Sequence, residues 1–452
     1  MSTESLVPDL IYGLNDKPPV RQSIFVALQH VLAVFVGIVT PPLIISKALN
    51  LPGADEAFLV SMALFISGVG TLLQSRRLGP IGSGLLSIQG TSFVFLGPII
   101  ALAKTMMAEG SASSPHAALG VVFGTCLIGA LVPILISPFI HRASRIITPL
   151  VTGIVVTLIG LTLVEVGITS LGGGFGARAN GTFGSPQNLL WAGLVIALIV
   201  VLNGSKSEWL RMISVVVGLA GGYVVAILAG KIGFGGLRDL PWFTVPTPLH
   251  YGLGVRLTAL IPFSFLYLIT AIESIGDLTA TSALTGEPIA GALYFQRLRG
   301  GVMADGVSSM LAALFNSFPS TTFAQNNGVI QLTGVGSRYI ALFVGAILIL
   351  LGLCPIVGGV VQSMPPSVLG GATIIMFGTV AVSGIKILSG VQMDRRSSTI
   401  TAISFGLGLG VTFVPDIMQG MPIIVKDTFS SGIATGGLCA LLLNTVLPGR
   451  KG

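Results

Sequence analysis

The chain has 452 residues, of which 52% are hydrophobic and only 9% are charged, whereas a soluble domain carries about 25% charged residues. This composition argues against a cytosolic enzyme, a nucleic-acid-binding protein and a disordered chain, because each needs far more charged surface. The net charge of +7 does not point to nucleic acid, since Lys and Arg form short doublets between apolar segments. The chain is therefore expected to lie in a lipid bilayer.

Fourteen apolar segments follow one another along the chain. A membrane-spanning helix needs about 20 mostly apolar residues, and the stretch before the first run lacks the features of a removable signal peptide. The first seven predicted spans cover 22–48, 57–74, 80–105, 117–140, 146–168, 187–204 and 211–230. After a polar stretch rich in Gly and Pro, seven more cover 256–284, 300–317, 319–335, 338–362, 366–388, 398–414 and 429–447.

The distribution of cations predicts the orientation of these spans. An even number of spans places both termini on one side, and loops on the cytoplasmic side carry more Lys and Arg. Placing the termini in the cytoplasm gives that side sixteen of the 23 cations. The opposite side keeps the other seven, which are Lys47, Lys104, Arg178, Lys231, Arg238, Arg256 and Lys426.

The two series of seven segments share weak internal similarity. TPLVTGIVVTLIG (148–160) resembles PPSVLGGATIIMFG (365–378), and LLSIQGTSF (85–93) resembles TTFAQNNGV (321–329). Because each series has an odd number of spans, the second is inverted relative to the first. The predicted fold is therefore an all-α polytopic membrane protein of two inverted repeats, a pattern typical of secondary transporters with a midplane substrate site.

The third and tenth segments are poor helices. Glycines interrupt the third, while Pro319 and the polar run 325–328 interrupt the tenth. Non-helical backbone at membrane depth occurs only where protein buries it or where it lines a cavity. We expect short β-strands at about 86–91 and 322–326, each leading into a half-helix whose unpaired N–H groups point toward a common centre.

Three acidic residues inside predicted spans are candidates for a proton-coupling site. Glu273 and Asp277 lie in the eighth segment and Asp305 in the ninth, where each costs about 2.5–3.5 kcal/mol at a helix centre. Glu273 and Asp277 are four residues apart, so they share a helical face and repel, which favours a bound proton. The alternative is that these acids bond to Ser and Thr hydroxyls and only hold helices together.

Amide side chains in the tenth segment are candidate ligands for a flat heterocycle. Gln325 and Asn326 supply hydrogen-bond donors and acceptors, and Gly328 permits close approach of the backbone. Gln325 and Glu273 together suit a ring that carries N–H and C=O groups. The alternative is that the amides satisfy the backbone of a broken helix.

Two further positions have both a functional and a structural interpretation. His30 is the only histidine inside a predicted span, and it either contacts the ligand or forms a bond between helices. Phe93, next to Ser92, offers an aromatic face for stacking, although a Phe in an apolar segment commonly packs in the core.

These motifs resemble the nucleobase-ascorbate transporter family, and within it the bacterial xanthine and urate permeases. The family signature is Gln or Glu, Asn, any residue, Gly, four further residues, Thr and then a basic residue or Gly. It is met from Gln325 to Gly334. The resemblance extends from about Asp16 to Gly449, through QHVLAVFVGIVTPPLI, GSGLLSIQGTSF, ITPLVTGIVV, AIESIGDLTATS and ADGVSSMLAALFNSFP.

The resemblance implies a core domain and a gate domain. It predicts a cytoplasmic tail at 1–21, a core formed by 22–140 and 256–362, and a gate formed by 146–230 and 366–447. It further implies a bacterial inner-membrane protein that dimerises through its gates and whose core carries substrate and a proton past the gate. No metal, catalytic residue or cofactor other than the coupling proton is expected.

The resemblance also implies roles for single residues. Glu273 and Gln325 match the principal substrate ligands, and Asp305 matches an essential acidic position. Asn326 matches the amide of the signature, and positions that affect binding or site architecture are matched by Asp277, His30 and Phe93. Xanthine-selective relatives commonly carry Asn where this chain has Ser92, and the smaller side chain leaves room for the additional oxygen of urate.

The sequence therefore predicts proton-coupled uptake of an oxidised purine, xanthine first and urate second. A urate-preferring permease and a broader nucleobase permease that accepts uracil are alternatives. An anion transporter of the same seven-plus-seven arrangement is disfavoured, because an unprotonated Glu273 would repel an anion. An enzyme is not expected, since the chain has no metal-spacing cluster, GxSxG motif or P-loop, and single-channel currents would distinguish a channel.

Overall fold

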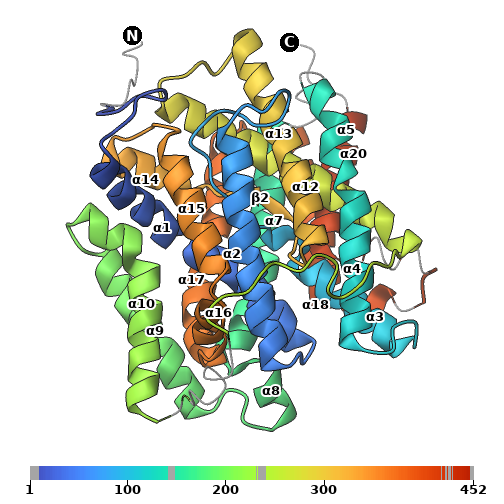
Figure 1. Ribbon diagram of the computed structural model, residues 1–452. Coiled ribbons are helices and arrows are strands. Elements are labelled where there is room, and N and C mark those ends of the chain that lie inside the picture. Colours follow the sequence, from blue (N-terminus) through green and yellow to red (C-terminus); the bar gives the residue numbers. More distant parts are fainter. Residues whose placement is uncertain are drawn as a thin grey trace.

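The computed structural model describes residues 10–140, 148–230, 232, 241–418, 420–422, 425, 429 and 431–447, which form a mostly helical body (Figure 1). The first half forms α1 (Val20–Ala48), α2 (Gly53–Ser75), β1 (Gln89–Thr91), η1 (Phe93–Phe95), α3 (Leu96–Ala108), α4 (Pro115–Gly129), α5 (Leu131–Ile136), η2 (Ser137–Phe139), α7 (Pro149–Leu171), α8 (Gly174–Ala179), α9 (Pro186–Asn203) and α10 (Glu208–Leu228). The second half forms α12 (Leu257–Leu284), α13 (Gly291–Leu314), β2 (Ser320–Thr322), α14 (Gln325–Thr333), α15 (Ile340–Gly352), α16 (Pro355–Gln362), α17 (Pro366–Ser389), α18 (Arg395–Phe413), η3 (Pro415–Met418) and α20 (Gly432–Val446).

These elements follow the fourteen predicted spans in chain order. By length and composition, seven described helices can cross a membrane, and the pair α15 and α16 adds an eighth as a broken span bent by 74°. The break lies just before Pro355, which lacks an N–H and cannot continue the hydrogen bonds of the preceding helix. The other predicted spans are shorter apolar helices, half-helices behind strands, or the more polar α13 and α18. Residues 1–9 and 146–147 of the predicted segments lie outside the described residues.

Helix packing repeats between the two halves of the chain. Between the halves, α2 of the first packs on α15 of the second, and α4 of the first packs on α13 of the second. Within each half, α9 packs on α10 and α18 packs on α20. The fifth segments of the two halves, α7 and α17, make extensive contact with each other. Their backbones approach closely, since a Cβ added at Gly160 would lie 2.2 Å from the Ala381 backbone N and one at Gly370 would lie 2.1 Å from that of Leu171. Such small residues allow helices to pack tightly inside a membrane.

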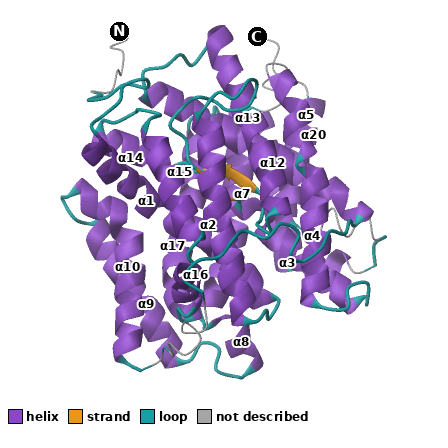
Figure 2. Cartoon of the chain, viewed as in Figure 1, coloured by secondary structure: helices purple, strands orange, loops and turns teal. Residues whose placement is uncertain are grey.

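The strands lie in the middle of the helical body (Figure 2). β1 and β2 pair antiparallel, with Gln89 opposite Thr322 and Thr91 opposite Ser320. The predicted strand in the tenth segment is present, but its bounds of about 322–326 are wrong, because β2 covers Ser320–Thr322 and α14 begins at Gln325. After Thr322 the chain turns into α14, with the Phe323 N–H bonded to the Ile88 carbonyl and the Asn326 N–H bonded back to the Phe323 carbonyl. The predicted match of LLSIQGTSF with TTFAQNNGV equates Gln89 with Gln325. In the structure Gln89 belongs to β1 and pairs with Thr322, whereas Gln325 begins α14, so this match is out of register.

The described cations separate toward two ends of the molecule. Lys17, Arg76, Arg77 and Arg338 line one pocket near the start of α1. Lys47 lies near the other end of α1, which has 29 residues and a length of about 43 Å, and Lys104 and Arg178 are close enough to repel each other. Lys231, Arg238 and Lys426 lie outside the described residues. Which end faces the cytoplasm stays a prediction, as does the division into core and gate domains.

Candidate functional site

The paired strands are held in the body by hydrogen bonds to surrounding helices. The Gln89 N–H donates to Thr71 Oγ1 of α2 at 3.1 Å, and the Ser320 N–H donates to Ser309 Oγ of α13 at 3.0 Å. Thr91 Oγ1 donates to the Ile38 carbonyl of α1 at 3.2 Å. Because buried backbone groups need partners, these hydroxyls explain how extended chain persists among apolar helices.

Three carboxylates converge on the strand pair. Asp305 of α13 accepts a hydrogen bond from Gln89 Nε2 at 2.5 Å, and Asp277 of α12 accepts one from Thr322 Oγ1 at 3.0 Å. Glu273 lies one helical turn before Asp277 and interacts electrostatically with both Asp277 and Asp305. The structure thus brings together the three predicted acids, from two helices, around one point of the strand pair.

The acids are incompletely bonded. Oε2 of Glu273 and Oδ2 of Asp305 are buried and have no hydrogen-bond partner, and no ion pair among the described residues joins the three acids to Lys or Arg. Asp277 has the hydroxyl partner that the structural alternative anticipated, whereas one oxygen of Asp305 is bonded to the amide of Gln89. Since unpaired buried charge is costly, a bound proton or the N–H donors of a ligand would stabilise the remaining oxygens.

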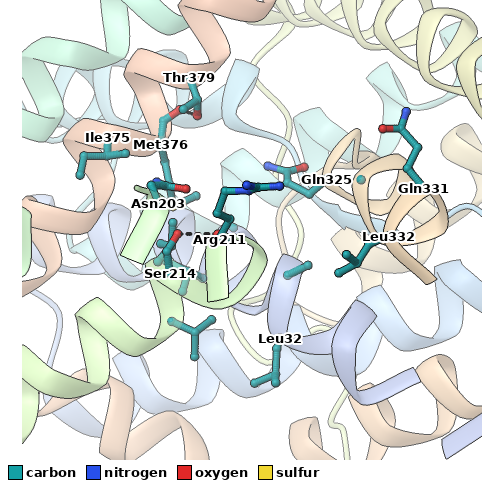
Figure 3. A pocket seen from close by; sticks show the side chains of 16 residues that line it. Leu32, Asn203, Arg211, Ser214, Gln325, Gln331, Leu332, Ile375, Met376 and Thr379 are labelled. Atoms are coloured by element: carbon teal, nitrogen blue, oxygen red, sulfur yellow. Dashed lines mark hydrogen bonds between the residues drawn. The ribbon is translucent and has the colours of Figure 1, made fainter. Parts of the chain in front are cut away.

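A cavity of about 590 Å³ lies between α1 and α14 on one side and α10 and α17 on the other (Figure 3). Gln325 and Gly328 line it from α14, while Arg211 and Ser214 of α10 and Thr379 of α17 line it from the opposite side. The Arg211 side chain extends toward Gln325. The volume lies within the range of about 300–1,000 Å³ that is usual for small-molecule sites.

Gln325 and Glu273 belong to elements that are directly joined. α12 packs on α14, and Thr281 Oγ1 of α12 donates to Asn327 Oδ1 of α14 at 2.7 Å. Gln325 lines the cavity, whereas Glu273 does not line it in this structure. The two predicted ligands therefore lie on neighbouring helices, Gln325 in the lining of the cavity and Glu273 close to Asp277 and Asp305.

His30 and Asn326 lie behind the cavity. His30 of α1 is fully buried, neither ring nitrogen has a hydrogen-bond partner within bonding geometry, and the Asn326 amide lies beside the ring. Asn326 Nδ2 donates to the Leu86 carbonyl at 2.5 Å, which ties α14 to the chain that leads into β1. Neither residue lines the cavity, so the structure gives Asn326 a supporting position, and direct ligand contact by either residue stays a prediction.

Phe93 lies where the two groups of helices meet. Its ring stacks on Phe323 with centroids 6.5 Å apart and meets the edge of Phe377 of α17 at 5.4 Å. The neighbouring Ser92 is buried and its Oγ has no partner. The Phe93 ring is thus positioned beside the strand ends, between elements of the predicted core and the predicted gate.

The expected free N–H groups are only partly present. The N–H groups of Asn326 and Asn327 donate to the carbonyls of Phe323 and Ala324, and the Ser92 N–H donates to the Pro319 carbonyl. The prediction that the half-helix starts present unpaired donors is therefore wrong for these three groups, because a tight turn satisfies the N–H groups of Asn326 and Asn327 and the chain entering β2 satisfies that of Ser92.

Sequence reasoning missed several residues of the site. Gln89 and Thr322, which bond the acids, were only parts of predicted strands, and Arg211 was only the first residue of the predicted span 211–230. The signal for Gln89 was a long polar side chain within an otherwise apolar segment. Glu165 was also missed as an acid inside the predicted span 146–168, and the structure leaves it exposed on α7.

Comparisons with known proteins give close matches over nearly the whole chain. The family model Xan_ur_permease, described as "Permease family", matches residues 21–417. The chain is 48% identical over 446 residues to the xanthine permease XanP of Escherichia coli K12, covering 98% of this chain and 96% of the relative. It is 37% identical over 426 residues to the uric acid permease PucJ of Bacillus subtilis, covering 92% and 91%.

A solved structure shares the fold. The transmembrane domain of the cyanobacterium bicarbonate transporter BicA superposes with a TM-score of 0.60 at 15% identity, covering 96% of this chain and 100% of that one. Together with the repeated helix packing, this likeness confirms the predicted architecture of two inverted seven-segment repeats with short strands in the third and tenth segments.

Proposed function

This chain belongs to the nucleobase-ascorbate transporter family of permeases, and from this premise we propose that it takes up an oxidised purine, xanthine first and urate second, together with a proton. The prediction that the protein is a transporter and not an enzyme is confirmed by its family. The proposal of a purine substrate is carried by the 48% identity to a xanthine permease over 98% of the chain. The alternative of a urate permease is supported by the 37% identity to PucJ.

The site supports recognition of a flat ring with N–H and C=O groups. Glu273 Oε2 is a buried acceptor without a partner, suited to a ring N–H, and the Gln325 amide in the cavity can both donate and accept. The Phe93 ring lies between Phe323, which follows β2, and Phe377 of α17, and we propose that it covers one face of the bound ring. For a purine to touch both polar groups, α12 and α14 would have to rearrange so that Glu273 faces the cavity.

Proton coupling is assigned to the three acids. A proton shared by Glu273, Asp277 and Asp305 would relieve their mutual repulsion, and Gln89 and Thr322 would orient two of them. A proton moving inward gains about 2.3 kcal/mol per 100 mV, equivalent to roughly fifty-fold accumulation of substrate. The cavity between α1 and α14 and the facing α10 and α17 supports an elevator-like movement of core against gate.

The proposed setting is the bacterial inner membrane, with both termini in the cytoplasm and a homodimer formed through the gates. The separation of described cations toward two ends supports a defined orientation. Val382 and Ile385 of the predicted gate are 62% and 52% exposed in the isolated chain, so apolar gate surface is available for lipid or a second copy.

Labelled xanthine uptake tests this function in cells that lack their own purine permeases. We expect accumulation that a protonophore abolishes, because the gradient drives uptake. Competition by unlabelled urate, uracil and sulfate separates the alternatives, since an anion transporter would respond to sulfate and a broad nucleobase permease to uracil. Absence of proton-dependent uptake of any purine or pyrimidine would contradict the proposal.

Ser92→Asn is expected to narrow the substrate range. The larger amide would occupy space next to Phe93, where the additional oxygen of urate would need room, so urate should compete less well while xanthine transport continues. The measurement is inhibition of labelled xanthine uptake by urate in both proteins. Equal weakening of xanthine and urate would remove Ser92 as a determinant of selectivity.

A further inference from the structure

A second concave site lies at the end of the molecule that carries the N-terminal segment. Its volume is about 400 Å³, and it shares no lining residue with the cavity at Gln325. Three stretches far apart in the sequence line it, 14–17, 75–78 and residues 338, 339 and 342. Four of the lining side chains are cationic and one, Asp16, is acidic. The cations are Lys17, Arg76, Arg77 and Arg338.

These cations are held near each other without a balancing partner. No side-chain hydrogen bond or ion pair joins any of the four to another described residue. The neighbouring Arg297, by contrast, pairs with Glu287 at 2.7 Å, and it is repelled by both Arg77 and Arg338. With four cations and only Asp16 as an acid in its lining, the pocket keeps a net positive charge.

The backbone leaves space for two of the arginines to meet. Arg77 and Arg338 both lie over Gly84, where an added Cβ would be 3.2 Å from Arg77 Cγ and 3.5 Å from Arg338 Nη1. Gly84 also has a φ of 72°, which disfavours other residues. The Arg77 side chain, just after α2, and the Arg338 guanidinium group, just before α15, thus both lie over one glycine.

We infer that this pocket binds a phosphate-bearing anion. Guanidinium groups match the oxygens of phosphate with paired hydrogen bonds, and basic pockets at the ends of transmembrane helices suit the head groups of anionic lipids. An anionic phospholipid and a soluble phosphate present the same chemistry to Arg77, Arg338 and Lys17. The pocket is open on the surface, since the arginines are exposed, so both sources can reach it.

A bound anion in this pocket would stabilise the position of α14 relative to α2 and the N-terminal segment. The N-terminal segment is bonded to the chain that follows α14, because Ile11 N–H donates to the Gly334 carbonyl at 2.8 Å and Arg338 N–H donates to the Leu14 carbonyl at 3.1 Å. An anion that joins Arg77 to Arg338 and Lys17 would link α2, this segment and the end of α14. The expected consequence is a higher melting temperature of the whole protein.

The test compares the full-length protein in nanodiscs of phosphatidylcholine alone, of phosphatidylcholine with phosphatidylglycerol, and of phosphatidylcholine with inorganic phosphate in solution. Melting temperature and lipid retained in native mass spectrometry are the readouts. Phosphatidylglycerol or phosphate should raise the melting temperature of the wild type, and the arm that does so identifies the source. The double variant Arg77→Gln/Arg338→Gln should bind the anion at least about tenfold more weakly, because it loses two charge-assisted contacts.

Arg299→Gln is the matched control, since Arg299 is an exposed arginine of α13 that does not line the pocket. It should respond to the anion as the wild type does. If the double variant does not fold, the single variant Arg76→Gln replaces it and should show a partial loss. A wild type that responds to neither anion, or an Arg299→Gln protein that loses the response equally, would overturn the inference.

Discussion

Glu273→Gln is expected to weaken xanthine binding by about 10- to 100-fold and to abolish accumulation against a gradient, because it replaces a charged acceptor with a neutral amide. Oε2 of Glu273 is buried without a partner, so the structure reserves this acceptor for a group that the chain itself does not supply. The measurement is binding of labelled xanthine to membranes, together with uptake in the permease-deficient cells.

The same substitution should not destabilise the protein. Glu273 repels Asp277 and Asp305 and has no ion-pair partner among the described residues, so an amide of the same shape removes repulsion from a buried cluster. We expect a melting temperature equal to or above that of the wild type. This separates a functional acid from a structural one, since loss of a structural bond would lower the melting temperature.

Glu165→Gln is the control for this chemical change, because Glu165 is an exposed acid of α7. It should leave binding and uptake at the level of the wild type. Normal xanthine binding by Glu273→Gln, or inactivation accompanied by a clear fall in melting temperature, would contradict the assignment of Glu273 as a ligand.

Gly90→Ala is expected to abolish xanthine binding, whereas Gly97→Ala, in the same segment, should leave it unchanged. A Cβ at Gly90 would lie 2.5–2.8 Å from three atoms of the Phe323 ring, while one at Gly97 would have no atom within 4 Å. The ring cannot retreat toward α1, because it already lies against Gly37, where an added Cβ would be 2.6 Å away. It would therefore be displaced against Phe93, on which it stacks.

Such overpacking costs about 1–3 kcal/mol and shifts the groups around it. Binding of labelled xanthine and the melting temperature of both alanine variants measure the effect. Phe323→Leu in the Gly90→Ala background should restore part of the binding, because the smaller side chain makes room for the added methyl group. Wild-type binding by Gly90→Ala would show that the contact between strand and ring does not shape the site.

Much of the architecture follows from local composition. An apolar run of about 20 residues has few structures available in a bilayer other than a helix, so helix bounds such as Val20–Ala48 and Leu257–Leu284 lie close to the predicted spans. The sequence also predicts that the third and tenth segments are interrupted, because clustered glycines and Pro319 disfavour a continuous helix. The exact register of the strands was not, because two short strands more than 200 residues apart contain little information about which residues pair.

The membrane location, the order of the segments and the three buried acids can be predicted from residue order alone, because hydrophobic length and the cost of buried charge act on each segment separately. The three-dimensional packing was needed to show that Gln89 bonds Asp305, that Arg211 faces Gln325 across a cavity (Figure 3), and that Arg77 and Arg338 share one pocket. These contacts join side chains that are distant along the chain, and they depend on how helices approach in space, which no local pattern records.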